Sequence, residues 1–201
     1  MKKIVKIFLI VILFILLIWI ATTIWAQAEG TAKIEIIGNE KSSKKALIVY
    51  DPDPFYNLDQ QVCESFANTL KDYDWRVTVG TVKAIKKTNI SSYDLYVFCA
   101  NTYNWDPDWS VSRYIQRSKD LYKKNVVAIT LGAGSTERSQ KSLEVLIKGK
   151  SVKLLGSKSF WLLKPNDETR TDVSNIKIVN EQVGKWALEL NDSIQESLKI
   201  K

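Results

Sequence analysis

Short apolar runs alternate with amphipathic stretches along most of this chain. Five runs rich in Val, Ile and Leu predict strands, at Ala46–Tyr50, Arg76–Thr81, Leu95–Cys99, Val126–Thr130 and Val152–Phe160. Short strands of this composition are typical of a parallel sheet that is covered on both faces. The stretches between them carry apolar residues at helical spacing. The pattern therefore predicts an α/β fold, a three-layer sandwich around a five-stranded parallel sheet with right-handed crossovers.

The helical stretches differ in how clear their periodicity is. The apolar positions that mark them are Val62, Cys63, Phe66, Ala67 and Leu70; Val111, Tyr114 and Ile115; Leu143, Val145, Leu146 and Ile147; and Val179, Val183, Trp186, Ala187, Leu190 and Ile194. The last group predicts a long helix that closes the sheet. Between the second and third strands, Lys83–Ser92 is too polar and too short for more than one helical turn.

The N-terminus carries a separate signal. Ile7 to Ala26 contains no charged residue, and Met1–Lys6 before it contains three lysines. Twenty helical residues span about 30 Å, the thickness of a bilayer hydrocarbon core. A cleaved signal peptide is the alternative, since Ala26-Gln27-Ala28 fits a small-x-small cleavage pattern. The length of the run favours an uncleaved single-pass membrane anchor that contacts lipid.

The anchor prediction divides the chain into three parts: residues 1–28 as membrane anchor or signal segment, 29–44 as linker, and 45–201 as the folded domain. Within the linker, Ile34-Glu35-Ile36 predicts a brief edge strand. The lysines of the tail favour a domain that faces outward, whereas Lys33 and Lys41 on the other side of the apolar run oppose that orientation.

Net charge and residue types narrow the function classes. The charge of +7 is spread over several lysine-rich patches, which indicates a solvated basic surface near anionic lipid rather than nucleic-acid binding. The chain has no histidine, which excludes a Ser-His or Cys-His nucleophile within one chain. Its two cysteines, Cys63 and Cys99, fit either core positions or, in an extracellular domain, a disulfide. We find no catalytic dyad, because the aspartates that flank prolines are typical of turns.

The loop after the first strand holds the strongest functional signal. Ala46–Tyr50 leads through Asp51–Leu58 into a helix, the arrangement by which open α/β folds build a phosphate cradle. Such cradles use Gly, Ser and Thr, and this loop has none. Pro52 and Pro54 lack N–H donors, and Asp51 and Asp53 would repel a phosphate.

Read in order, these segments resemble the flavodoxin family of FMN-binding domains from about Lys44 to Leu190. Lys45–Tyr50 with Val62–Leu70 resembles its opening strand and helix, and Tyr93–Phe98 its third-strand entry. Asn101–Pro107 and Leu131–Thr136 fall where the family has its ring-packing loop and its glycine loop. The resemblance implies strand order 2-1-3-4-5, with a ligand at the carboxyl edges of strands one, three and four.

The resemblance also implies a cofactor, FMN, and a site for it. The residues expected there are Asp51, Phe55, Tyr56, Asn57, Thr102, Tyr103, Trp105, Gly132, Ala133 and Gly134. The function implied is a membrane-anchored electron-transfer module with a redox partner in the membrane, the flavin carrying the redox step. The opening loop departs from the family's Ser/Thr-x-Thr-Gly-x-Thr/Ser pattern, which leaves a second hypothesis: a flavodoxin-like binding or scaffold domain that has lost the flavin site.

Overall fold

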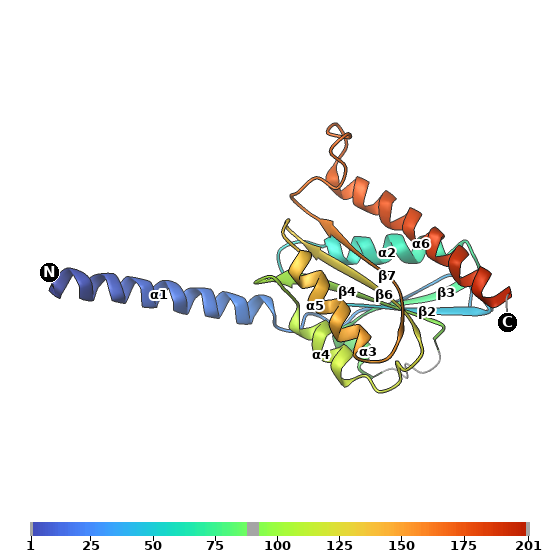
Figure 1. Ribbon diagram of the computed structural model, residues 1–201, viewed down its shortest axis with the longest axis horizontal. Coiled ribbons are helices and arrows are strands. Elements are labelled where there is room, and N and C mark those ends of the chain that lie inside the picture. The colour runs from blue at the N-terminus through green and yellow to red at the C-terminus, as the bar shows by residue number, and fades with distance from the viewer. Residues whose placement is uncertain (1, 88–92, 200–201) are drawn as a thin grey trace.

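The central sheet has the parallel strand order expected from the sequence. The computed structural model describes residues 2–87 and 93–199, and its parallel strands are β2 (Lys44–Tyr50), β3 (Trp75–Thr81), β4 (Leu95–Tyr103), β6 (Asn125–Gly132) and β7 (Lys153–Trp161). They lie in the order β3-β2-β4-β6-β7, which is 2-1-3-4-5 counted along the parallel strands (Figure 1). The predicted three-layer α/β fold is confirmed.

Two further strands extend the predicted sheet of five. β1 (Ile34–Ile37) pairs antiparallel with β3 at one edge, and β5 (Asp106–Pro107) forms a two-residue antiparallel pair with the end of β4. β5 follows β4 through a tight turn, which makes that pair antiparallel. The brief edge strand expected within residues 29–44 is present as Ile34–Ile37.

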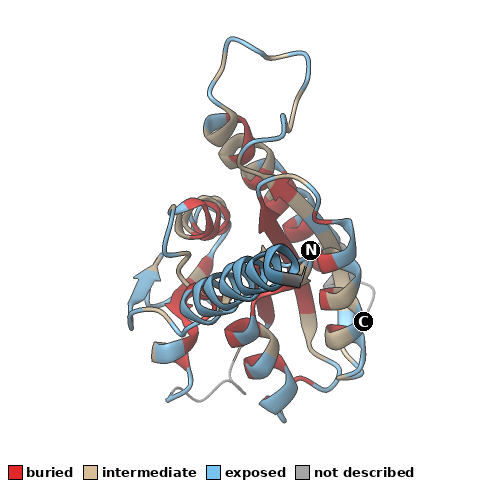
Figure 2. Ribbon diagram, turned by 90° about the vertical axis from the view of Figure 1, so that its left-hand side faces the viewer, coloured by how far each residue is buried: buried red, intermediate tan, exposed pale blue. Residues whose placement is uncertain are grey.

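Helices cover both faces of the sheet. On one face lie α2 (Leu58–Lys71) and α6 (Asn175–Lys199), and on the other lie α3 (Val82–Ile85), α4 (Trp109–Arg117) and α5 (Glu137–Lys148). Each layer encloses its own apolar core, and the strands β3, β2, β4 and β6 between the two are mostly buried (Figure 2). The strands read as continuous apolar runs because both of their faces are covered.

The apolar positions predicted for the helices are buried except Leu146, which is half-buried, and Val145. Val145 is 71% exposed, so its assignment to the core was wrong. It lies two residues beyond Leu143, and two residues turn an α-helix by about 200°, to the opposite side. The single turn expected after the second strand is α3; positions 88–92 of that stretch lie outside the described residues. The thiols of Cys63 and Cys99 are free, buried and adjacent.

The N-terminal helix α1 (Lys2–Ala26) projects away from the domain (Figure 1). It is long and apolar enough to cross a membrane, and its apolar window is not buried against the rest of the chain. An apolar helix that is exposed over nearly its whole length needs another apolar environment.

Trp186 is the main contact that holds α6 against the sheet. Its ring lies between Phe66 of α2 and Phe160 of β7, with centroid distances of 6.2 and 6.4 Å. The close approach depends on Gly156, where an added Cβ would lie 2.9 Å from the Trp186 ring. The tryptophan thus joins the two helices of this layer to the last strand.

We expect Trp186→Ala to lower the free energy of unfolding by about 3–5 kcal/mol, the usual loss for a buried large aromatic residue. Thermal or urea unfolding of the full chain in detergent, followed by near-UV circular dichroism, measures the change. Trp105→Ala is the matched control, because the Trp105 side chain is 57% exposed. Equal losses in the two variants would contradict this account of α6.

Candidate functional site

Three loops at the carboxyl edge of the sheet bring together the residues that the sequence marked as a site. They follow β2, β4 and β6, the strands at the centre of the order. The first loop carries Asp51, Phe55, Tyr56 and Asn57. Thr102 and Tyr103 end β4, and Trp105 lies in the second loop; Gly132 ends β6, and Ala133 and Gly134 lie in the third loop. In open α/β sheets this edge, beside the point where the strand order reverses, is where ligands bind.

A side-chain carboxylate fills the turn of the first loop. Asp53 Oδ1 accepts hydrogen bonds from the backbone N–H groups of Phe55, at 2.7 Å, and Tyr56, at 3.3 Å. Asp53 Oδ2 accepts one from the Tyr103 hydroxyl at 2.6 Å. Backbone amides that converge in such a turn are the donors that would hold a phosphate. Here they are already satisfied by an anion that belongs to the chain.

Below this turn, Asn101 joins the first and second loops. Its Nδ2 donates to the backbone oxygen of Asp51 at 3.1 Å and to Asp59 Oδ2 at 3.0 Å. Asp59 Oδ2 also accepts from the backbone N–H of Asp53 at 2.6 Å, and its Oδ1 accepts from the Gln60 N–H at 2.7 Å. The carboxylates of Asp53 and Asp59 are therefore both engaged with donors of the chain around the first loop.

Asp108 connects the second loop to α4. Its Oδ1 caps the helix by accepting from the Val111 N–H at 2.8 Å, and its Oδ2 accepts from the Asn101 N–H at 3.0 Å. The sequence assigned Asp51, Asp53 and Asp108 to turns, and their hydrogen bonds agree with that assignment. Asn101, Asp59 and Asp108 were not among the expected site residues, although Asn101 directly follows the apolar run of its strand.

Burial raises the pKa of three of these carboxyl groups. Desolvation is the largest cause in each case, and it raises the pKa of Asp51 to about 6, of Asp59 to about 6 and of Asp108 to about 8. Hydrogen bonds to the carboxylates oppose the shift, and the negative charges of the neighbouring aspartates add to it. The edge thus holds three crowded acids, an unfavourable environment for a further anion.

The third loop is tied to the chain that follows β7. The backbone oxygen of Ala133 accepts from the N–H groups of Leu163 and Lys164, at 3.1 and 3.0 Å. At Gly132 an added Cβ would lie 2.7 Å from Thr136 Cγ2 and 3.2 Å from Thr102 Cβ, so a glycine is needed for close packing. At Gly134 the nearest atom would be 3.8 Å away, which leaves that backbone open.

The end of α1 lies against this same edge. The Trp25 ring meets Phe55 edge-on at a centroid distance of 5.3 Å, and the backbone N–H of Trp109 donates to Gln27 Oε1 at 2.9 Å. The Gly30 N–H donates to Asp51 Oδ1 at 3.1 Å. A Cβ on Gly30 would lie 2.8 Å from Pro52, so the chain passes directly over the first loop. The contact of residues 25–30 with the carboxyl edge could not be predicted from the sequence, because Gln27 and Gly30 belong to no periodic pattern.

Exposed aromatic side chains gather where α1 meets the domain. Phe55 and Trp105 are 59% and 57% exposed, and Trp109 is also exposed. Asn104 and Trp105 both have positive φ, 51° and 63°, which turns the second loop outward. The aromatic residues predicted to line a ring thus lie at this edge, and Trp25 lies against Phe55.

Comparisons with known proteins agree on the fold. No family model and no curated relative matches the sequence. Among solved structures, flavodoxin 2 of Bacillus cereus is 16% identical, with a TM-score of 0.58 over 74% of this chain and 99% of that one. A mutant flavodoxin of Fusobacterium nucleatum bound to flavin mononucleotide is 13% identical, with a TM-score of 0.52 over 75% and 96%.

A domain of similar fold also forms part of a larger protein. Rubredoxin oxygen:oxidoreductase of Desulfovibrio gigas is 16% identical, with a TM-score of 0.53, and the match covers 77% of this chain but only 38% of that one. These likenesses show that the chain has a flavodoxin-like fold.

The first loop does not fit the phosphate of FMN. The amides of Phe55 and Tyr56 already bind Asp53, two prolines remove other donors, and three buried acids lie beneath. A phosphate placed there would have to displace the Asp53 carboxylate from these donors and would lie close to further carboxyl groups. The Asp53 carboxylate thus already accepts from the backbone donors that would be needed for a phosphate in this loop.

The raised pKa of Asp51 predicts a pH-dependent stability that Asp51→Asn removes. Asp51 titrates near 3.8 when unfolded and at about 6 when folded, so the folded state retains the proton longer and the wild type loses stability as pH rises between these values. One pKa unit corresponds to about 1.4 kcal/mol, so the loss is about 1–3 kcal/mol. Asparagine can keep both the Gly30 and the Ser110 contacts.

We therefore expect Asp51→Asn to match or exceed wild-type stability at pH 8 while showing no such gain at pH 4. Urea unfolding of the full chain in detergent at the two pH values measures the difference. Asp172→Asn, at an exposed position, is the control. A variant that is destabilised equally at both pH values would contradict the assignment of this titration to Asp51.

Proposed function

We propose that this chain is a membrane-anchored flavodoxin-like domain that acts as a binding module and does not carry FMN. The observation that supports the proposal most directly is the Asp53 carboxylate, which occupies the backbone donors of the first loop. The contact between Trp25 and Phe55 adds to it, because a residue of the anchor helix itself lies against one of the aromatic residues expected around the ring.

The anchor is α1. Its window Lys3–Ala26 has a mean hydropathy of 3.2 and no part of it is buried in the domain. At 1.5 Å per residue its 24 residues extend about 36 Å, enough to cross a hydrocarbon core with some tilt. The lysines at positions 2, 3 and 6 favour a cytoplasmic tail and an outward-facing domain.

The contacts of α1 determine which side of the domain faces the lipid. Gln27 and Gly30 hold the chain directly over the carboxyl edge, so that edge lies next to the end of the span. Phe55, Trp105 and Trp109 are exposed on the same side. Aromatic side chains favour the level of the lipid headgroups. In this arrangement the three loops rest at the membrane surface.

Flavin-dependent electron transfer is the second candidate, and the fold favours it. One structural neighbour is a flavodoxin described as bound to flavin mononucleotide, and Tyr103 at the end of β4 and Trp105 in the second loop lie at the same edge. If the ring were held without the phosphate, stacking on aromatic residues would supply the affinity. FMN and riboflavin would then bind equally well.

A flavin titration separates the two candidates. We expect the purified full chain, in nanodiscs of zwitterionic lipid, to be colourless and to leave the fluorescence of added FMN unchanged up to about 1 mM. Riboflavin is the matched probe, since it differs only by the phosphate. Quenching of FMN at micromolar concentration would overturn the proposal, and equal quenching of riboflavin would assign the affinity to the ring.

If the three loops rest at the membrane surface, residue 105 is expected to lie at the level of the lipid headgroups. The native thiols are both buried, so a nitroxide label reacts with an introduced cysteine only. We expect a label on Trp105→Cys in nanodiscs to show the oxygen and nickel accessibilities of the headgroup layer by electron paramagnetic resonance. A label on Tyr122→Cys is the control: Tyr122 is exposed and lies just before β6, at the opposite end of the sheet.

The control label is expected in bulk water. Identical, water-like accessibilities at both positions would contradict the seating of the carboxyl edge on the bilayer. The Tyr122→Cys variant also reports orientation, because a membrane-impermeant maleimide added to intact cells labels it only if the domain faces outward.

A further inference from the structure

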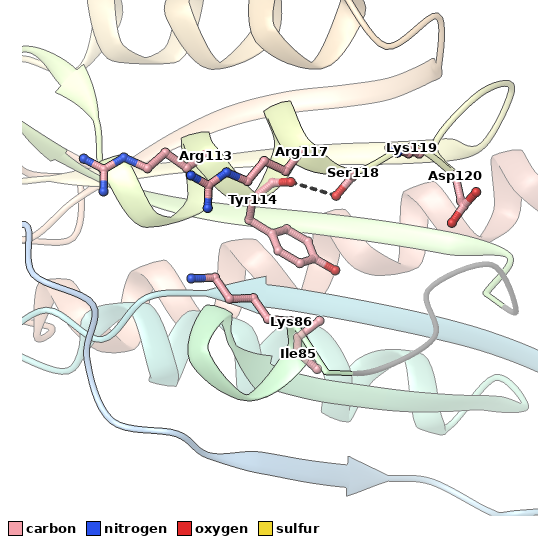
Figure 3. A pocket seen from close by; sticks show the side chains of 8 residues that line it. All are labelled: Ile85, Lys86, Arg113, Tyr114, Arg117, Ser118, Lys119 and Asp120. Atoms are coloured by element: carbon pink, nitrogen blue, oxygen red, sulfur yellow. Dashed lines mark hydrogen bonds between the residues drawn. The ribbon is translucent and has the colours of Figure 1, made fainter.

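A cavity lies between α3 and α4, and none of its lining residues belongs to the three carboxyl-edge loops. Its volume is about 430 Å³, and its lining residues are Ile85, Lys86, Arg113, Tyr114, Arg117, Ser118, Lys119 and Asp120 (Figure 3). None of them was expected to form a site from the sequence. A volume of this size is in the range that proteins use for small ligands.

The cavity is strongly basic. Four of its eight lining residues are cations and one is an anion. Arg113 and Arg117 are one helical turn apart on α4, so both guanidinium groups lie on the same side of the helix, and Lys86 reaches toward them from α3 (Figure 3). Asp120 lies at the other end of the cavity from Arg113, which leaves one end cationic.

These cations have few partners within the chain. Lys86 pairs with Glu29, next to the end of α1, and Arg113 lies over the Trp109 ring at 5.4 Å. Within residues 2–87 and 93–199, neither Arg117 nor Lys119 forms an ion pair or a hydrogen bond through its side chain. A group of cations held together without matching carboxylates costs free energy through mutual repulsion, which an anionic ligand relieves.

Tyr114 supplies the second, independent observation. The residue is only 8% exposed, and its hydroxyl has no hydrogen-bond partner among the described residues. The ring extends from α4 toward α3, into the cavity (Figure 3). Burial raises the pKa of the phenol, so the hydroxyl stays protonated and can donate. A buried donor without an acceptor is costly, and it is unusual in a folded protein.

We propose that this cavity binds a phosphate monoester group, with Arg117 and Lys86 at its charge and the Tyr114 hydroxyl donating to one of its oxygens, while Arg113 adds positive charge at one end. Arginine matches phosphate geometry because the planar guanidinium presents parallel N–H donors. The site is distinct from the first loop, where acidic side chains fill the donors. The same chemistry is offered by the headgroup of a monoester phospholipid and by a soluble phosphate ester.

The position of Lys86 favours a source close to the bilayer without deciding it. Lys86 contacts Glu29, three residues beyond the end of α1, so the cavity opens beside the segment that leaves the span. The probes are therefore glycerol 3-phosphate, as the soluble ester, and nanodiscs that contain one fifth phosphatidic acid in phosphatidylcholine, as the lipid form.

The test measures binding of both probes to the full chain in nanodiscs. For glycerol 3-phosphate, isothermal titration calorimetry and phosphorus NMR line broadening give the affinity; for the lipid, native mass spectrometry gives the retained phosphatidic acid. We expect Arg113→Gln with Arg117→Gln to weaken binding at least tenfold. The control, Lys141→Gln with Lys185→Gln, removes the same charge at exposed positions outside the cavity and should change binding less than twofold.

Tyr114→Phe tests the hydroxyl separately, because it keeps the ring in the core. A hydrogen bond to a charged group contributes about 1.5–3 kcal/mol, so we expect roughly a tenfold loss or more. Near-UV circular dichroism verifies that each variant is folded. Stronger retention of the lipid than of glycerol 3-phosphate assigns the lipid source, and the reverse assigns the soluble one.

Two outcomes would overturn the proposal: no binding of either probe at 10 mM ester or in the lipid nanodiscs, or equal loss in the cavity variant and in the Lys141/Lys185 control. The second outcome would mean that net charge alone attracts the probes. Neither outcome bears on the flavin titration, which concerns the other site.

Discussion

The hydrogen bonds to the Asp53 carboxylate determine the character of the carboxyl edge. By accepting from Phe55, Tyr56 and Tyr103, this one side chain closes the first loop on itself and joins it to the second. The Asp53 N–H then reaches Asp59, which in turn holds Asn101 and the end of β4. An ordinary flavodoxin-like sheet thereby presents an edge whose donors are satisfied internally, and its capacity for recognition must lie elsewhere.

The domain thus has two regions of opposite charge, the acidic carboxyl edge and the basic cavity between α3 and α4. The edge beside α1 combines buried acids with exposed aromatic rings, which suits contact with the uncharged and dipolar part of a bilayer surface. The cavity between α3 and α4 combines cations with a buried phenol, which suits an anion. The cations lie in the layer of α3 and α4, whereas the layer of α2 and α6 encloses the larger apolar core.

The sequence predicted the fold well and the site only in outline. Buried parallel strands appear as continuous apolar runs, so the strand order followed from the resemblance and the helices from their periodicity. The sequence also showed that Asp51–Leu58 lacks the residues of a phosphate loop. It could not show that the Asp53 carboxylate accepts from the backbone N–H of Phe55, because a hydrogen bond between residues two positions apart depends on the local backbone angles. Nor could it show contacts such as Gly30 with Asp51 or Lys86 with Glu29, which join residues 21 and 57 positions apart.

The close passage of Gly30 over Pro52 has a mechanical consequence. A span that ends at Ala26 and is fastened to the domain four residues later leaves almost no slack, so the domain cannot swing on a tether or sample the volume that a flexible linker would allow. With α1 spanning a membrane as proposed, the domain would keep a fixed height and a fixed face toward the lipid. Its encounters with other membrane molecules would then be a two-dimensional search by lateral diffusion, limited to partners of matching height.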